Sequence, residues 1–142
     1  MGMFDSFHIS ATALTSQRLR MDTVSANIAN AQTTRGTLVD GEWQPYTRKM
    51  TVLQEAPFRQ QLSAVSGGVQ VAEIVEDESP YKLVYDPSHP DSDERGYVQM
   101  PNVDLLQEMV DLMGATRSYE ANIAAMNASK AMLVKAMEIG KG

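Results

Sequence analysis

The sequence predicts an α+β fold, in which long N- and C-terminal helices pack as a coiled-coil-like pair and a small β-rich insert separates them along the chain. Apolar residues recur every three or four positions near both ends of the 142-residue chain, and all six prolines lie between positions 45 and 101. The length is that of one ordinary domain. We divide the chain into an N-terminal helical segment (1–36), a β-rich insert (37–101) and a C-terminal helical segment (102–142). The two helical segments are expected to form one helical domain.

Residues from about Met3 to Ala31 are predicted to form one helix. Its apolar positions at heptad spacing are Phe7, Leu14, Met21 and Ile28, and Val24 and Ala31 each lie three residues further on. Asp5 or Ser6 is suited to cap the start of this helix, and residues 33–36 end it.

The middle of the chain has the turn signals and short extended runs of a β-rich region. The segments with strand-like composition are Tyr46–Leu53, Val69–Val75, Lys82–Tyr85 and Tyr97–Met100. We expect them to form one small sheet of three to five strands with long loops. Residues 54–65 fit either a loop or a short helix, and the sequence leaves both open.

Residues from about Asn102 to Glu138 are predicted to form the second long helix, with Asn102 as its N-cap and Gly140 at its end. Its heptad track is Leu105, Met109, Leu112, Thr116, Tyr119, Ile123, Met126, Lys130, Leu133 and Met137. Spacings of four and three alternate along the track, which is typical of a coiled-coil seam. Only Thr116 and Lys130 break its apolar character.

The C-terminal helix has few charges for a helix that faces solvent. Between Leu112 and Ser129 the only charged residues are Arg117 and Glu120, and small side chains occupy several faces at once. The N-terminal helix likewise carries mostly Ser, Thr, Asn, Gln and Ala outside its apolar track. This pattern favours helices that are surrounded by helices of other subunits. The alternative is an ordinary two-helix hairpin with a weakly charged surface.

Composition argues against several kinds of function. A net charge of −6 argues against nucleic-acid binding, which needs a basic surface. The absence of cysteine excludes thiolate metal sites, thiol nucleophiles and disulfides. No apolar run reaches the roughly 18 residues of a membrane span, and the N-terminus lacks the pattern of a cleaved signal peptide, so we expect no membrane insertion.

An acidic turn holds the one cluster of residue types that commonly bind metals. Its members are Asp86, His89, Asp91, Asp93 and Glu94. Their spacing does not match a calcium loop, and the Asp-Pro and His-Pro pairs favour turns instead. We interpret these acids as solvating an exposed turn. Because no nucleophile motif, Gly-rich phosphate loop or convincing pair of catalytic carboxylates is recognisable, we expect neither an enzyme nor a cofactor.

Three stretches resemble the flagellar axial protein family. Residues 13–34, with Ala26-Asn27 and Ala29-Asn30 before Thr33, are similar to the N-terminal signature of rod and hook proteins. Residues 108–122 are similar to the C-terminal helix that the family shares. Residues 79–103 and the shortness of the insert are similar to the proximal-rod members in particular. Arg35 departs from the family pattern, in which glycine usually follows soon after the Thr pair.

The resemblance implies a structural subunit of the proximal rod of the bacterial flagellar basal body. Such a subunit is exported uncleaved by the flagellar type III apparatus. It then polymerises in the periplasm, with itself and other rod subunits, into a helical tube that transmits torque and conducts exported subunits. The terminal axial helices would form the inner tube and the insert its outer face.

The residues expected at subunit interfaces are Leu14, Met21, Val24, Asn27, Ile28, Asn30, Leu105, Met109, Leu112, Tyr119, Ile123, Met126, Leu133 and Met137. They combine the apolar helix tracks with two asparagines of the N-terminal signature. A soluble adaptor or export-chaperone-like helical hairpin is the alternative function. It gives no reason for the stretch at residues 79–101.

Overall fold

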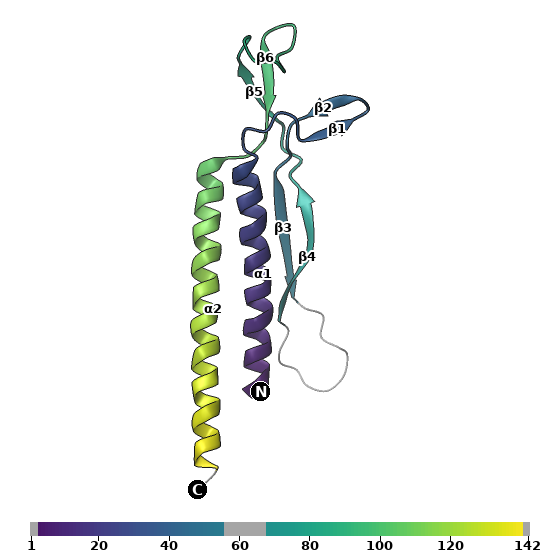
Figure 1. Cartoon of the computed structure of the whole chain (residues 1–142). Helices are drawn as coiled ribbons and strands as arrows, with labels where there is room; N and C mark the ends of the chain where they lie inside the picture. The colour runs from purple at the N-terminus through teal and green to yellow at the C-terminus, as the bar shows by residue number, and fades with distance from the viewer. Residues whose placement is uncertain (1–2, 56–67, 141–142) are drawn as a thin grey trace. The chain divides into compact units, whose positions relative to one another are not determined.

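The computed structural model describes residues 3–55 and 68–140 (Figure 1). In chain order its elements are α1 (Met3–Ala29), β1 (Thr37–Val39), β2 (Glu42–Gln44), β3 (Lys49–Glu55), β4 (Val69–Glu76), β5 (Lys82–Tyr85), β6 (Tyr97–Met100) and α2 (Leu105–Ile139). The two long helices and the β-rich middle that the sequence predicts are confirmed. Most of residues 54–65, where the sequence leaves loop and helix open, lies outside the described residues.

The chain forms two compact units. Unit 1 contains Met1–Met21, Thr51–Glu73 and Met113–Gly142, and unit 2 contains Asp22–Met50 and Ile74–Leu112. Each unit therefore holds a stretch of both helices, and in each the helices touch. In unit 1 the hydroxyl of Thr116 donates to the sulfur of Met21 at 3.6 Å. In unit 2 the amide of Asn27 donates to a carboxylate oxygen of Glu108 at 3.0 Å. The late turns of α1 thus meet the early turns of α2, and the two helices pack antiparallel.

Thr12 and Ser16 of α1 in unit 1 face a strand of the same chain. The hydroxyl of Ser16 donates to the carbonyl of Val69 at the start of β4 at 3.1 Å. The backbone N–H of Val69 in turn donates to the hydroxyl of Thr12 at 3.3 Å. These hydroxyls give the edge of β4 hydrogen-bond partners that an apolar helix face could not offer. One neighbour of α1 is therefore β4 of the same chain. The low charge of α1 in the sequence predicted neighbours but did not identify β4 as one of them.

The expected single sheet is wrong: the described strands form three separate two-stranded sheets, β1–β2, β3–β4 and β5–β6. The predicted strands at 82–85 and 97–100 are confirmed, and they pair antiparallel from Lys82↔Met100 to Tyr85↔Tyr97. Pro45 lies between β2 and β3, and Pro80 lies between β4 and β5, so each separates strands of different pairs. Because proline has no N–H to donate, it interrupts the continuous ladder that a larger sheet requires.

The β1–β2 hairpin is an element that the sequence reading missed. Its turn residues Asp40 and Gly41 have φ values of 51° and 89°. Two successive positive φ values are the mark of a type I′ turn, for which Asp-Gly is a favoured pair. The hairpin base is held by the N–H of Gly36, which donates to the carbonyl of Gln44 at 2.8 Å. The Asp-Gly pair in the sequence is the feature from which this hairpin could have been predicted.

Helix α2 begins later than predicted, at Leu105, and its cap is not Asn102. A carboxylate oxygen of Asp104 accepts the backbone N–H groups of Leu106 (3.0 Å) and Gln107 (3.3 Å), as an N-cap does. The side chain of Asn102 is buried and bonds elsewhere. At the other end, the N–H of Gly140 donates to the carbonyl of Ala136 at 3.1 Å, in agreement with the predicted end. Neither helix, over the residues described, combines the length and the apolar character needed to span a bilayer.

Gly36 offers a direct test of the hairpin base. A Cβ added at this position would lie 2.7 Å from both the backbone N and the Cα of Tyr46, so backbone would have to move. We expect Gly36→Ala to destabilise the protein by about 1–3 kcal/mol, measured as a lower thermal midpoint by circular dichroism.

The matched control is Gly114→Ala, which adds the same methyl group inside α2 where nothing lies within 4 Å. It is expected to stabilise the protein by up to about 1 kcal/mol, because alanine has the higher helix propensity. Equal effects of the two substitutions would contradict the close approach at Gly36.

Candidate functional site

Arg48, which precedes β3 in unit 2, binds a completely buried carboxylate. Its Nε donates to Oε1 of Glu108 at 2.6 Å, and the Glu108 side chain is 0% exposed. The same guanidinium lies 3.2 Å from a carboxylate oxygen of Asp77 and 3.7 Å from one of Asp111. Burial by itself would lower the pKa of Arg48, but the hydrogen bonds and negative charges of Glu108 and Asp77 outweigh it and raise that pKa.

Asn27 of α1 lies against the other side of the same carboxylate. Its Nδ2 donates to Oε2 of Glu108 at 3.0 Å and to the carbonyl of Lys49 at 2.8 Å. Its Oδ1 accepts the N–H of Lys49 and the hydroxyl of Tyr46, both at 3.0 Å. Both amide hydrogens and both oxygen lone pairs are therefore used. Burial, followed by the negative charge of Glu108, raises the pKa of Tyr46.

Asn102 connects the strand region to the segment just before α2. Its Oδ1 accepts the N–H of Arg48 at 2.8 Å, and its Nδ2 donates to the carbonyls of Asp77 and Ser79, both at 3.0 Å. Hydrogen bonds from the N–H and hydroxyl of Ser79, and then from Arg48, lower the pKa of Asp77.

We call Asn27, Arg48, Asn102 and Glu108 the polar junction. It joins α1, the start of β3, the 77–79 loop and α2 within unit 2. A buried ionic network of this kind is destabilised strongly when one member is removed, because the partner charge is left without compensation. The polar junction therefore has a structural function.

The aspartates of the acidic turn bind specific donors, so the expectation that they only solvate the turn is wrong. Asp91 accepts the hydroxyl of Thr34 at 2.7 Å and the Nε of Arg35 at 2.8 Å. Asp93 accepts the backbone N–H of Tyr97 at 2.8 Å. Over the described ranges, no group of three or more His, Asp or Glu residues is arranged to hold a metal ion.

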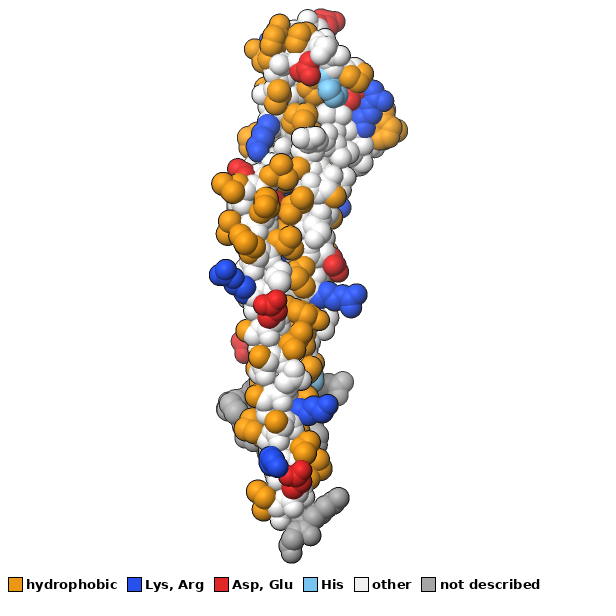
Figure 2. All heavy atoms as spheres, turned by 60° about the vertical axis from the view of Figure 1, so that its left-hand side comes forward, with side chains coloured by type: hydrophobic (Ala, Val, Ile, Leu, Met, Phe, Trp, Pro, Cys, Tyr) orange, Lys and Arg blue, Asp and Glu red, His pale blue; other side chains and the backbone are white. Residues whose placement is uncertain are grey.

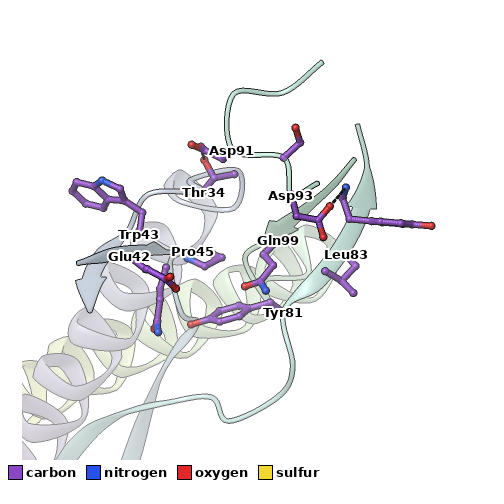
Figure 3. A pocket seen from close by; sticks show the side chains of 12 residues that line it. Thr34, Glu42, Trp43, Pro45, Tyr81, Leu83, Asp91, Asp93 and Gln99 are labelled. Carbon is purple, nitrogen blue, oxygen red and sulfur yellow. Dashed lines mark hydrogen bonds between the residues drawn. The ribbon is translucent and has the colours of Figure 1, made fainter. Parts of the chain in front are cut away.

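A cavity of about 560 Å³ in unit 2 lies between β2, the acidic turn and the β5–β6 pair (Figure 3). Tyr81 and Gln99 lie centrally in this view, whereas Trp43 extends away from the other labelled side chains. The lining includes Asp91 and Asp93, which already accept protein hydrogen bonds, and it includes no His, Lys or Arg.

The predicted interface residues fall into three groups by exposure. Val24 and Asn27 are buried within the chain; Leu14, Met21, Ile28, Asn30, Leu112, Tyr119, Ile123, Met126 and Leu133 are half-buried; and Leu105, Met109 and Met137 are exposed. All of these residues except Asn30, which directly follows α1, lie on α1 or α2. The structure brings Asn27 into the polar junction.

An apolar face on the first turns of α2 was only partly predicted. Leu105 and Met109 were expected at an interface, but Leu106 and Val110 were not, and these two are 74% and 57% exposed. We call these four residues the α2 apolar face. Figure 2, which turns the α2 side forward, shows hydrophobic side chains gathered on that side. The available signal was the spacing 105, 106, 109 and 110, which forms a stripe wider than a heptad track.

Comparison with known proteins identifies the family. The sequence model described as "Flagella basal body rod protein" matches residues 7–36, and the one described as "Flagellar basal body rod FlgEFG protein C-terminal" matches residues 94–139. The flagellar basal-body rod protein FlgC of Bacillus subtilis is 55% identical over 150 residues, which cover 99% of this chain and all of that protein. The chain belongs to the FlgC family.

FlgC relatives from other bacteria are also similar over their whole length. The protein of Borreliella burgdorferi is 44% identical and covers 100% of both chains, and that of Salmonella typhimurium is 42% identical over 99% of this chain and all of the relative. FlgC proteins are structural components of the basal-body rod and not enzymes. The predicted structural role is confirmed.

Removing one partner of the buried ion pair tests the polar junction. Arg48→Met leaves the Glu108 carboxylate buried without its cation and is expected to cost about 3–5 kcal/mol of stability, measured by urea unfolding. Arg48→Met combined with Glu108→Leu is expected to recover most of that loss. Arg18→Met, at an exposed position of α1, is the control and should change little. A double variant as unstable as the single one would contradict this account of the pair.

Asp91 gives a prediction for pH. The hydrogen bond from Arg35, and then that from Thr34, lowers the pKa of Asp91. Its contribution to stability is therefore present above the ordinary aspartate pKa of about 3.9 and is lost as pH falls through the lower folded pKa. Arg35→Met should move the Asp91 pKa upward in a carboxyl ¹³C NMR titration, whereas Arg95→Met should leave it in place. An unchanged Asp91 pKa in Arg35→Met would contradict the assigned cause.

Proposed function

We propose that this FlgC-family protein polymerises through faces of α1 and α2 into the proximal part of the flagellar rod. The resulting helical tube transmits torque and conducts exported subunits. The observation that carries the proposal is the row of apolar side chains left partly or largely exposed along two helices of a rod-family chain. Monomeric proteins rarely expose large contiguous apolar patches, so such a surface marks a site of assembly.

Both helices have the side chains that close packing between subunits requires. Ile123, Met126 and Leu133 on α2 are half-buried and follow the heptad spacing. Alanines 121, 124, 125 and 128 are exposed around them, and small side chains permit close approach of neighbouring helices. In this proposal the segments 1–36 and 102–142 form the coiled-coil-like inner layer, and residues 37–101 form the outer face. Apart from Val24 and Asn27, which are buried within the chain, the predicted interface residues make contacts between subunits.

The remaining partners follow from the same assembly. We propose that the chain passes uncleaved through the flagellar export apparatus, joins other rod subunits in the periplasm and neither enters the membrane nor binds nucleic acid. The net charge of −6 supports the last point, because nucleic acids bind basic surfaces.

Ile123 tests the proposed packing surface of α2. Ile123→Asp places a charge where neighbouring helices would exclude water, and an unpaired buried carboxylate costs several kcal/mol. We expect this variant to be exported but to give no rods and no swimming in a strain that lacks the wild-type gene. Swimming halos and rod recovery from isolated basal bodies measure the outcome.

The matched control for Ile123→Asp is Ile123→Met, which keeps the position apolar at similar volume and should support swimming. Normal swimming of Ile123→Asp would show that this face of α2 stays in solvent. If Ile123→Asp is degraded before export, circular dichroism of the purified variant shows whether it still folds. We expect it to retain its helical signal, because Ile123 is already partly exposed in the chain.

A further inference from the structure

The imidazole ring of His89 lies beside two groups of Asp91, its backbone N–H and its carboxylate. Nδ1 of His89 accepts the N–H of Asp91 at 3.1 Å, and the same Nδ1 lies 3.9 Å from Oδ2 of Asp91. A ring nitrogen that accepts an N–H carries no hydrogen, so the proton of the neutral ring is on Nε2. The two side chains are 31% and 23% exposed, so their contact is partly shielded from water.

Hydrogen bonds on both sides of His89 hold the backbone of the acidic turn. The N–H of His89 donates to the carbonyl of Asp86 at 3.3 Å, and the N–H of Ser92 donates to the carbonyl of His89 at 3.1 Å. Oδ1 of Asp86 accepts both the N–H of Ser88 at 3.1 Å and its hydroxyl at 2.6 Å. Because these bonds do not involve the ring, a change in the protonation of the ring acts first on Asp91.

Asp91 links the acidic turn to the segment that follows α1. Its Oδ2 accepts the hydroxyl of Thr34, and its Oδ1 accepts the Nε of Arg35. Thr34 and Asp91 also line the cavity of about 560 Å³, and Figure 3 shows them side by side. The position of the Asp91 side chain therefore affects both this link and one wall of the cavity.

We propose that His89 is a pH-sensitive switch of the acidic turn. When neutral, the ring accepts the N–H of Asp91 and leaves the carboxylate to Thr34 and Arg35. When protonated, Nδ1 carries a hydrogen, so the ring releases that N–H and turns to Oδ2 of Asp91 as a donor. Thr34 uses the same oxygen, so its bond to the acidic turn is loosened. This inference concerns the folded chain and does not rest on the assembly proposed above.

The charged groups that face His89 provide a partner for each state of the ring. The carboxylates of Asp86 and Asp91, on its own turn, attract a protonated ring, and Arg35, bound to Asp91, opposes it. Histidine side chains ordinarily change charge between about pH 5 and 8. The hydrogen bond from Arg35 lowers the pKa of Asp91. Hydrogen bonds from Ser88 lower the pKa of Asp86. Both carboxylates therefore stay charged over the range in which a histidine titrates.

Nuclear magnetic resonance of the full chain between about pH 8 and pH 5 tests the switch. At the higher pH, the imidazole ¹⁵N shifts should show the proton of His89 on Nε2. As His89 becomes protonated, the hydrogen-exchange protection of the Asp91 amide should fall about fivefold, which corresponds to one ordinary hydrogen bond. Protection is taken relative to an unstructured chain at the same pH. A proton on Nδ1 at the higher pH, or unchanged protection of Asp91 while His89 titrates, would overturn the proposal.

His89→Asn is the decisive variant, because an asparagine Oδ1 replaces Nδ1 as an acceptor and does not titrate. In this variant the Asp91 amide should have the same protection at both ends of the pH range. The Nε–H resonance of Arg35 should shift with the titration of His89 in the unsubstituted chain and stay in place in His89→Asn.

His8→Asn, at an exposed position of α1, is the matched control and should lose Asp91 protection as the unsubstituted chain does. A pH-dependent loss of Asp91 protection in His89→Asn would show that another group controls the turn, and the proposal would then be wrong.

Discussion

The buried Arg48–Glu108 ion pair decides how the first turns of α2 are oriented. Glu108 has no exposed side-chain area because Arg48 and Asn27 bind its two carboxylate oxygens. Residues two positions away on a helix lie about 200° further round, so burying Glu108 turns Leu106 and Val110 outward. A monomer governed only by hydrophobic burial would prefer the opposite rotation. In unit 2 the charged side chain of Glu108 is therefore buried, whereas the apolar side chain of Leu106 is exposed.

The burial of Glu108 with Leu106 and Val110 exposed has a physical reason if the chain is a subunit of a larger assembly. A buried salt bridge contributes little net stability, but it tolerates only one geometry, since each misplaced partner leaves an unpaired charge. The polar junction can therefore fix which side of α2 faces inward, although it adds little to the free energy of unfolding. In the proposed assembly, the apolar side chains that it turns outward would be buried in contacts between subunits. Stability of the unit and affinity of assembly then depend on different residues of one helix.

The family comparison is consistent with this division. The two matching rod sequence models cover residues 7–36 and 94–139, and these ranges contain Asn27 and Glu108. Arg48 and the β1–β2 hairpin lie between these ranges, in a part of the chain that the full-length FlgC relatives also cover.

Local patterns in the sequence determined the two helices and the strands at residues 82–85 and 97–100, because helix and strand periodicity depend on neighbours within a few residues. They did not determine that Asn102 bonds Arg48 while Asp104 caps α2, since either residue type is a good N-cap. Nor could they show the burial of Glu108, whose partners Arg48 and Asn27 lie 60 and 81 residues away in the chain. Heptad spacing is a property of one helix by itself. The side of that helix that faces inward depends on which distant donors meet its carboxylate, and only the tertiary structure brings those donors together.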